Sequence, residues 1–300
     1  MTQEFYDQTL PVAVSGATGT QGGAAVRALL RAGRPVRAVT RDVSSPAATA
    51  LRELGAEVVR ADFDEPDSLL AALRGAGGLF AMSTPFRTDL ETEVRQGTAL
   101  LDAARTAGTV AHIVFTSATN ADLGTGIPHF DSKWRIEQHL VGLGVPWTVL
   151  GPGAFMENYA NSWTLQSLRE GYFSIPMPVD RPLPVVAAAD IGAFAALALS
   201  DPARFAGRRI DLASQWRTPS QIAAAISAAC GREITAREVP LAVAESYSTD
   251  LAAMFRYFQE VGLTVDIDAL HRDHPQVEWH TFERWAAGRP WRLDPADGRL

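Results

Sequence analysis

The fold is decided by residues 12–22, which read VAVSGATGTQG. A short apolar run leads into a turn with glycines at 16, 19 and 22, and an alanine-rich helix is predicted to open at Gly22. The first glycine permits a tight turn, the second lets backbone approach a pyrophosphate, and the third lets the helix pack closely on the strand. The N–H groups and positive dipole end of the helix favour phosphate. We therefore predict a strand–turn–helix unit that binds a dinucleotide.

The glycines follow the spacing G-x-x-G-x-x-G instead of G-x-G-x-x-G. Whether the motif binds a dinucleotide therefore depends on the elements that surround it. The motif lies at the first strand–helix junction of a repeating pattern, which is the context that a dinucleotide site requires. The alternative is a glycine-rich turn without a ligand. The residues expected to contact the cofactor here are Gly16, Thr18, Gly19, Thr20, Gln21 and Gly22.

The first half of the chain alternates strand and helix patterns. Strands are expected to start near Val12, Val36, Ala56, Gly78, His112 and Trp147. The runs 79–82 and 113–115 are apolar without alternation, which is typical of strands buried on both faces. Repeated β-α units predict an α/β fold with a Rossmann-type, doubly wound parallel sheet and helices on both sides. A ligand is then expected at the carboxyl ends of the strands.

The pattern changes after residue 153. Residues 154–184 are expected to form loops around one helix. Further elements are expected as helices over 191–199, capped by Asp190, and over 218–230, 241–259 and 281–287, and as strands over 208–213 and 234–239. Residues 218–221 form a capping box with proline at the first helical position. We therefore divide the chain into a dinucleotide-binding domain over 1–153 and a smaller C-terminal α/β substrate or partner lobe over 154–300, packed on the mouth of the sheet.

The composition limits the classes of function. The chain has 300 residues, of which 47% are hydrophobic, a net charge of −7 and one cysteine, Cys230. No cluster of basic residues stands out, which argues against direct binding of nucleic acid. One cysteine suits a reducing compartment. Residues 1–10 lack the basic region of a signal peptide, and residues 185–199 are too short and too weakly apolar to span a bilayer. We expect a cytoplasmic protein with no membrane contact.

The end of the second expected strand indicates which dinucleotide is bound. This strand ends Val39-Thr40-Arg41-Asp42. A carboxylate at this place holds the ribose hydroxyls of NAD, whereas a guanidinium suits a 2′-phosphate. Arg41 therefore favours NADP(H), and Asp42 leaves NAD(H) open. The alternative for Arg41 is a solvated surface side chain.

Polar and aromatic residues also follow the third and fourth strands. Asp62 is expected to accept from the adenine amino group, with Phe63 beside the ring. Ser83 and Thr84 are expected to line the cofactor ribose, because they stand at the carboxyl end of a strand. Phe86 is expected to line the cofactor or the substrate pocket, and its alternative is a core position.

The candidate catalytic residues follow the fifth strand. The strand ends Thr116-Ser117, and helical spacing puts His129 and Lys133 on one face of the next helix. Here the sequence resembles the short-chain dehydrogenase/reductase superfamily, with its serine after this strand and its Tyr-x-x-x-Lys pair. The resemblance assigns the serine to Thr116 or Ser117, and assigns Lys133 to the nicotinamide ribose. His129 stands at the tyrosine position, either as proton donor or as part of the substrate pocket, and its alternative is a helix-start residue satisfied by backbone.

The whole pattern is most similar to the NmrA-like, or HSCARG-like, branch of the atypical members of this superfamily. The matching segments are 16–22, 40–42, 129–133 and 144–158. This resemblance implies a dinucleotide site. The branch holds NAD(P)-sensing regulators with little or no catalysis, and also resembles reductases of quinones, dyes and phenylpropanoids that retain the lysine without requiring the tyrosine.

The loop over 151–158 is expected to cross the nicotinamide, with Phe155 packing on it and Asn158 pointing inward. Tyr159, Trp163 and Tyr172 are then expected to wall an apolar pocket for an aromatic substrate. The alternative is that these aromatic residues only join the two lobes.

Other motifs are incomplete. His271, His274 and His280 have no further ligand on a regular element, so we expect no metal site. No Gly-x-Ser-x-Gly elbow occurs, which leaves a serine hydrolase unsupported. The leading hypothesis is an NADPH-dependent oxidoreductase that transfers hydride to a planar, electron-poor substrate such as a quinone or enone. The alternatives are a non-catalytic NADP(H) sensor that acts through a protein partner, and a non-redox cyclase or isomerase.

Overall fold

The computed structural model of the chain describes residues 7–84 and 89–293. It divides the chain into two compact units, which are treated separately below. One unit holds Met1–Pro152 and Ala188–Asp211, and the other holds Gly153–Ala187 and Leu212–Leu300. The chain therefore crosses the predicted boundary near residue 153 more than once, because residues 188–211 return to the first unit.

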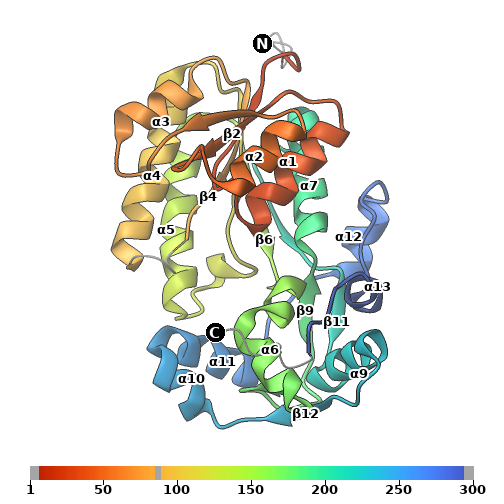
Figure 1. Cartoon of the computed structure of the whole chain (residues 1–300). Coiled ribbons are helices and arrows are strands. Elements are labelled where there is room, and N and C mark those ends of the chain that lie inside the picture. The colour runs from red at the N-terminus through yellow and green to blue at the C-terminus, as the bar shows by residue number, and fades with distance from the viewer. Residues whose placement is uncertain (1–6, 85–88, 294–300) are drawn as a thin grey trace. The chain divides into compact units, whose positions relative to one another are not determined.

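In the described residues, the first unit is built on a seven-stranded sheet with the order β3-β2-β1-β4-β5-β6-β10 (Figure 1). Strands β1 to β6 pair in parallel, and the order reverses between β1 and β4. This confirms the predicted Rossmann-type fold and places the expected ligand site at the carboxyl ends of β1 and β4. The strands are β1 (Val12–Val14), β2 (Val36–Thr40), β3 (Glu57–Arg60), β4 (Gly78–Met82), β5 (His112–Thr116), β6 (Trp147–Pro152) and β10 (Arg208–Leu212).

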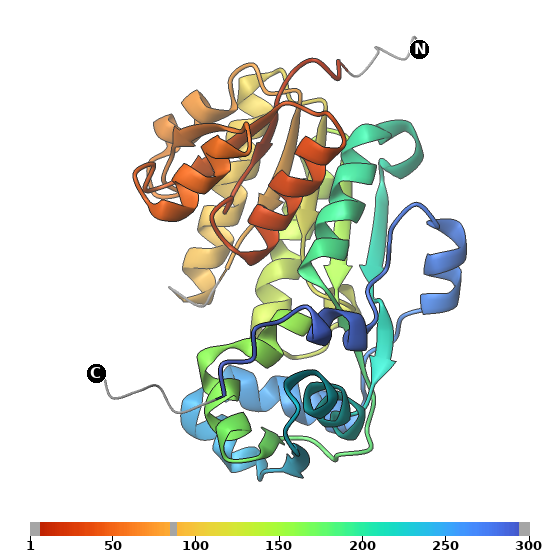
Figure 2. The ribbon, with the colours of Figure 1, turned by 45° about the vertical axis from the view of Figure 1, so that its right-hand side comes forward.

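Helices cover both faces of this sheet, as Figures 1 and 2 show. One face carries α1 (Thr20–Arg31), α2 (Pro46–Glu53) and α7 (Ala188–Ser200), which leads to the short α8 (Pro202–Phe205). The other face carries α3 (Pro66–Leu73), α4 (Leu90–Ala107) and α5 (Pro128–Gly142). A one-turn 3-10 helix, Ala121–Leu123, precedes α5.

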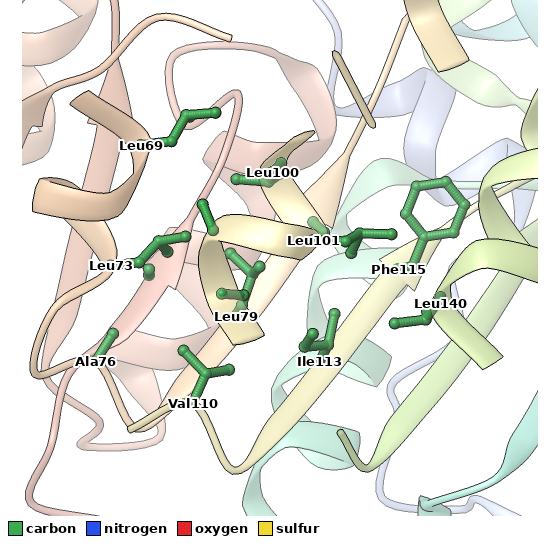
Figure 3. Close-up of a cluster of buried hydrophobic side chains, with 14 of the residues drawn as sticks. Leu69, Leu73, Ala76, Leu79, Leu100, Leu101, Val110, Ile113, Phe115 and Leu140 are labelled. Carbon is green, nitrogen blue, oxygen red and sulfur yellow. The ribbon is translucent and has the colours of Figure 1, made fainter. Parts of the chain in front are cut away.

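The core between the sheet and α3, α4 and α5 is built from the unbroken apolar runs of the central strands (Figure 3). Leu79 on β4 and Ile113 and Phe115 on β5 are buried there. Each such side chain stabilises the fold by about 1.5–3 kcal/mol through burial. Their partners from the covering helices are Leu69, Leu73, Leu100, Leu101 and Leu140.

Local sequence signals set many of the helix boundaries. The Ser45 side chain accepts from the Ala48 N–H at 3.2 Å, and the capping box of Thr218 and Gln221 is present. Helix α1 begins at Thr20, two residues earlier than predicted. Helix α7 begins at Ala188, so the residue predicted as its cap lies in the first turn.

The second unit combines two small sheets with helices. In the described residues the sheets have the orders β11-β9-β7 and β12-β8. The predicted helix over 241–259 is in fact two helices, because Ser248 is extended and caps the second one by accepting from the N–H groups of Asp250 and Leu251. The strands are β7 (Ala154–Phe155), β8 (Tyr172–Ile175), β9 (Leu183–Val186), β11 (Gln215–Arg217) and β12 (Thr235–Glu238). The helices are α6 (Ser162–Arg169), α9 (Pro219–Cys230), α10 (Leu241–Tyr247), α11 (Thr249–Glu260), α12 (Ile267–Asp273) and α13 (Phe282–Ala287), with a 3-10 turn at Met156–Ala160.

Candidate functional site

The glycine loop between β1 and α1 is shaped by close contacts that a side chain would block. Gly16 has a φ of +60°, and a Cβ there would lie 2.6 Å from the sulfur of Met82. A Cβ on Gly22 would lie 2.2 Å from the carbonyl oxygen of Gly16, so α1 approaches the loop as closely as backbone allows. Gly19 is the N-cap of α1 and gives it no side-chain cap in the described residues. The first turn of α1 therefore offers its N–H groups to an outside acceptor such as a pyrophosphate.

The polar side chains of this loop divide into exposed and anchored ones. Thr18 and Thr20 are exposed on either side of Gly19. Gln21 is half-buried, and its Oε1 accepts a hydrogen bond of 2.7 Å from the Thr116 hydroxyl at the end of β5. This bond ties the glycine loop to the strand that precedes the candidate catalytic residues.

Thr116 and Ser117 therefore do different things. Whereas Thr116 binds the glycine loop, the Ser117 hydroxyl donates to the carboxylate of Glu137 on α5. Glu137 is buried and also accepts from Arg209 Nε at 3.0 Å. Burial raises the pKa of the Glu137 carboxyl against the opposing effect of the nearby guanidinium. The structure thus places Ser117 in a buried ionic cluster that the sequence did not predict.

Arg209 is the centre of that cluster. Its guanidinium donates to the Ala118 carbonyl at 2.7 Å and pairs with Asp211, and with Asp122 at 3.3 Å. Because Arg209 and Asp211 lie on β10, these bonds hold the edge strand to the segment after β5. Asn120, in the left-handed region with a φ of 59°, donates to Asp211 at 2.9 Å and belongs to the same cluster.

Arg41 and Asp42 follow β2, and both are exposed. The Asp42 carboxylate accepts from the hydroxyl and N–H of Ser44, at 2.6 and 2.8 Å. These hydrogen bonds hold the pKa of Asp42 below its ordinary value. Arg41 is exposed. The carboxylate is thus used by the turn before α2, and the neighbouring guanidinium is presented to solvent.

Asp62 and Phe63 lie directly beyond β3. The Asp62 carboxylate accepts from the N–H of Asp64 at 3.0 Å, and Ser68 accepts from the Asp62 N–H at 2.9 Å. Phe63 is half-buried and packs against the hydrophobic core that contains Leu69, Leu73 and Leu79. These hydrogen bonds fix the backbone of the loop between β3 and α3.

Lys133 is held in a buried group of polar side chains, here named the Lys133 cluster: Ser83, Glu93, Ser132 and Lys133. The Lys133 ammonium donates to Glu93 Oε1 at 2.9 Å and to the Ser83 carbonyl at 3.2 Å. The Ser83 hydroxyl donates to the same Oε1 at 2.9 Å, and the Ser132 hydroxyl donates to Oε2. Ser83 follows Met82, against which the glycine at 16 packs, so the cluster lies next to the glycine loop.

Glu93 is the residue of this cluster that sequence reasoning missed. It is fully buried, although it lies in the first turn of α4. The buried face of this helix is formed by positions 93, 97, 100, 101, 103 and 104. A carboxylate at the first position of an otherwise apolar face with helical spacing was the signal that could have identified it.

His129 lies in the first turn of α5, the helix that carries Lys133. It is buried, its ring meets the edge of Phe130 at 4.8 Å between centroids, and its carbonyl accepts from the Ser132 hydroxyl at 3.1 Å. Thr84 is half-buried beyond β4. Phe86 lies outside the described residues.

The candidate residues of the second unit have separate surroundings. Tyr159 is buried, with its ring against Phe173 and Phe282 at centroid distances of 5.5 and 5.6 Å, and burial raises its pKa. Tyr172 is exposed, and the Arg237 guanidinium covers its ring at 4.2 Å. The structure thus places Tyr159 in the core and Tyr172 at the surface.

The other predicted residues of this unit lie near its first turn. Phe155 ends β7 and is half-buried, and Asn158 is exposed in the following 3-10 turn. The Asn158 carbonyl accepts from the Thr164 hydroxyl at 3.1 Å. Trp163 lies in α6, and its side chain is outside what the structure describes.

Two broader properties concern the described residues only. They contain no group of three or more His, Cys, Asp or Glu side chains arranged to hold a metal ion, and His271 stacks on Trp279 at 4.8 Å. Among the helices of residues 7–84 and 89–293, none has both the length and the apolar character needed to cross a membrane.

The doubly wound sheet, the glycine loop and the lysine of α5 define a Rossmann-type protein of the atypical short-chain dehydrogenase/reductase class. A model of the NmrA-like family matches residues 8–286, and the chain belongs to this family.

Relatives of the chain include enzymes and a regulator. NAD(P)H azoreductase of Xenophilus azovorans is 33% identical over 246 residues, which cover 80% of this chain and 81% of that protein. Nitrogen metabolite repression protein nmrA of Emericella nidulans is 27% identical over 97% of this chain and 84% of its own length. The structure of an NADPH-dependent quinone oxidoreductase from Escherichia coli has a TM-score of 0.77 and 25% identity, covering 92% of this chain and 98% of that one.

Proposed function

We propose that this chain is an NAD(P)H-dependent reductase that prefers NADPH and acts on a planar, electron-poor substrate such as a quinone or enone. The observation that carries the proposal is the Lys133 ammonium, anchored by Glu93 and the Ser83 carbonyl next to the glycine loop. The similarity to an NAD(P)H azoreductase over most of both chains supports the same reaction class.

The residues present fit a dinucleotide. In the glycine loop, the absence of a Cβ at Gly22 lets α1 start against the backbone of Gly16, and the first turn of α1 supplies uncapped N–H groups for the pyrophosphate. Arg41 supplies an exposed guanidinium for a 2′-phosphate, which binds such groups through paired charge-assisted hydrogen bonds. Lys133 supplies an N–H donor for the nicotinamide ribose. When bound, the cofactor would supply the hydride.

Proton delivery in this proposal does not depend on the tyrosine of the superfamily pattern. His129 replaces the tyrosine of the superfamily pattern, and we propose that it shapes the substrate pocket. An electron-poor substrate needs little help from a general acid, so water is a sufficient proton source. Ser117 is bonded to Glu137 within the buried cluster, which makes it a supporting residue of this site.

The proposal predicts that the protein oxidises NADPH when a quinone or enone is added. Measuring the loss of NADPH absorbance across a panel of quinones, enones and azo dyes tests this. Lys133→Ala should weaken NADPH binding and abolish turnover. If both properties are unchanged in Lys133→Ala, the proposed role of this lysine is wrong.

A sensor of the NADPH/NADP ratio is the second candidate function. The regulator nmrA matches 97% of this chain, and a histidine stands where the superfamily places its catalytic tyrosine. Tight NADPH binding without oxidation by any substrate of the panel would favour this function. Capture of a protein partner that depends on the cofactor's redox state would then support it.

A further inference from the structure

The Lys133 cluster contains a buried ion pair between α4 and α5, two helices that also contact each other at other positions. Glu93 on α4 is fully buried, and the Lys133 side chain on α5 is 12% exposed. On the surface, Glu91 and Arg135 already join the same two helices by a two-pronged ion pair. At the same interface, Gly97 lets α4 approach α5 so closely that a Cβ on this glycine would lie 2.6 Å from the Ile136 side chain. The helix interface is therefore secured by close apolar packing and a surface pair.

A buried ion pair is an expensive way to join two helices. Removing both charges from water costs free energy that their attraction does not fully return, and apolar residues of similar volume often stabilise as well or better. Stabilisation of the α4–α5 interface is therefore a poor explanation for the pair of Glu93 and Lys133. The effect of the pair on the Lys133 ammonium accounts for it better.

Lys133 is the only lysine among the 27 lysine and arginine residues of the chain. Elsewhere the protein uses guanidinium groups as its cations. An ammonium is compact and has three N–H donors around one nitrogen, whereas a guanidinium is a wide planar fork. The Glu93 carboxylate and the Ser83 carbonyl take two donors of this ammonium. Within residues 7–84 and 89–293, the third donor has no hydrogen-bond partner.

We infer that Glu93 is the positioning residue of this site: its buried carboxylate fixes Lys133 as a charged, oriented donor whose remaining N–H serves the nicotinamide ribose. This inference rests on the proposed function. Ser83 and Ser132 orient Glu93 in turn, because their hydroxyl groups occupy both of its carboxylate oxygens. The arrangement makes Lys133 a donor held in one direction.

Glu93 is the carboxylate that pairs with this ammonium, at 2.9 Å. The ionisable residues on the same face of α5 as Lys133 are His129, one turn earlier, and Glu137, one turn later, whereas Asp131 and Arg135 are exposed. Glu137 is engaged by Arg209 and a serine hydroxyl, and no contact between it and Lys133 is present among the described residues. Loss of the Glu93 charge is therefore expected to make the Lys133 ammonium easier to deprotonate.

Amine labelling of the protein without cofactor tests this directly. Lys133 carries the only side-chain amine, so a lysine-directed acetylating reagent, read by mass spectrometry of the peptide that contains residue 133, reports on one group. Glu93→Gln keeps the shape and hydrogen-bonding capacity of the side chain and removes its charge. Labelling near pH 8 should be slow in the wild type and about tenfold faster in Glu93→Gln.

Glu91→Gln is the matched control. It makes the same chemical change in the same helix turn and breaks an ion pair with the same neighbouring helix, at the surface. Its labelling rate should equal that of the wild type. If Glu93→Gln also labels like the wild type, while circular dichroism shows both folded, the inference is overturned. Should Glu93→Gln not fold, Ser132→Ala makes the same test with an expected increase of about threefold.

NADPH affinity supplies the second readout. Calorimetry should show about tenfold weaker binding for Glu93→Gln and unchanged binding for Glu91→Gln. If Glu93 acts through Lys133, then Lys133→Met combined with Glu93→Gln should bind NADPH no more weakly than Lys133→Met alone. Additive losses would overturn the inference. Absence of NADPH binding by the wild type would instead overturn the proposed function, and the assigned ribose with it, whatever the labelling shows.

Discussion

Arg41 and Asp42 are adjacent residues of opposite charge, and hydrogen bonding decides which of them is available to a cofactor. The Asp42 carboxylate accepts two hydrogen bonds from Ser44 and is thereby committed to its own turn. Sequence position alone did not separate these two residues. A side chain that already has partners gives them up at a cost, whereas the exposed Arg41 gains partners when an anion binds.

At the residue scale we predict that Arg41→Ala weakens NADPH binding by about 1.5–3 kcal/mol, because one charge-assisted contact to the 2′-phosphate is lost. NADH lacks this phosphate, so its affinity should stay the same. Calorimetric titration of both cofactors measures the difference. Equal affinities of the wild type for NADPH and NADH would contradict the assignment of Arg41.

His112 leads to a prediction about stability. It is buried at the start of β5, where Nε2 lies 2.9 Å from the Thr148 hydroxyl, and burial lowers its pKa from 6.5 to about 4. Between these values only the unfolded state takes up a proton, so the free energy of unfolding falls as the pH is lowered. The loss should reach about 3 kcal/mol near pH 4. Urea unfolding of the wild type and of His112→Gln checks this, since the variant should lose that part of the pH dependence.

At the element scale, the packing of α7 on α1 depends on the absence of a side chain. A Cβ on Gly192 would lie 2.5 Å from the backbone carbon of Ala24. No rotamer change relieves a contact with backbone, so the two helices must move apart.

We therefore predict that Gly192→Ala destabilises the protein by about 1–3 kcal/mol, as overpacked sites do. Gly142 at the end of α5 is a matched helical glycine, because a Cβ there meets nothing within 4 Å. Gly142→Ala should be neutral or stabilise slightly, since alanine favours helix. Thermal unfolding of both variants measures the contrast, and equal effects would show that the α1–α7 contact is adaptable.

The sequence was informative wherever structure follows from neighbouring residues. The cap at Ser45, the box at Thr218 and the tight turn at Gly16 all depend on local chemistry and were predictable. The partner of Lys133 was not, because Glu93 stands 40 residues earlier on another helix. A carboxylate in a first helical turn is ordinarily an exposed helix-stabilising group, and only tertiary packing buries this one.

At the scale of the whole molecule, the same limit applies to strands. Residues 208–212 have the pattern of a strand, but the pattern does not say which sheet the strand joins. Backbone pairing and the buried Arg209 cluster place it at the edge of the large sheet, beside β6. The first unit is thus discontinuous in sequence, and a boundary drawn at one position separates residues 188–211 from the rest of that unit.

This discontinuity predicts that a fragment of residues 1–153 does not fold cooperatively. It lacks α7, whose close packing covers α1, and it lacks β10, whose Arg209 neutralises the buried Glu137. An exposed apolar face and an unpaired buried carboxylate both favour the unfolded state. Circular dichroism on heating should show a broad, weak change for the fragment and a sharp transition for the full chain. The opposite outcome is a sharp transition of the fragment, with a midpoint temperature that NADPH raises further. That result would show that residues 1–153 form an independent domain and that residues 188–211 are not needed for its folding.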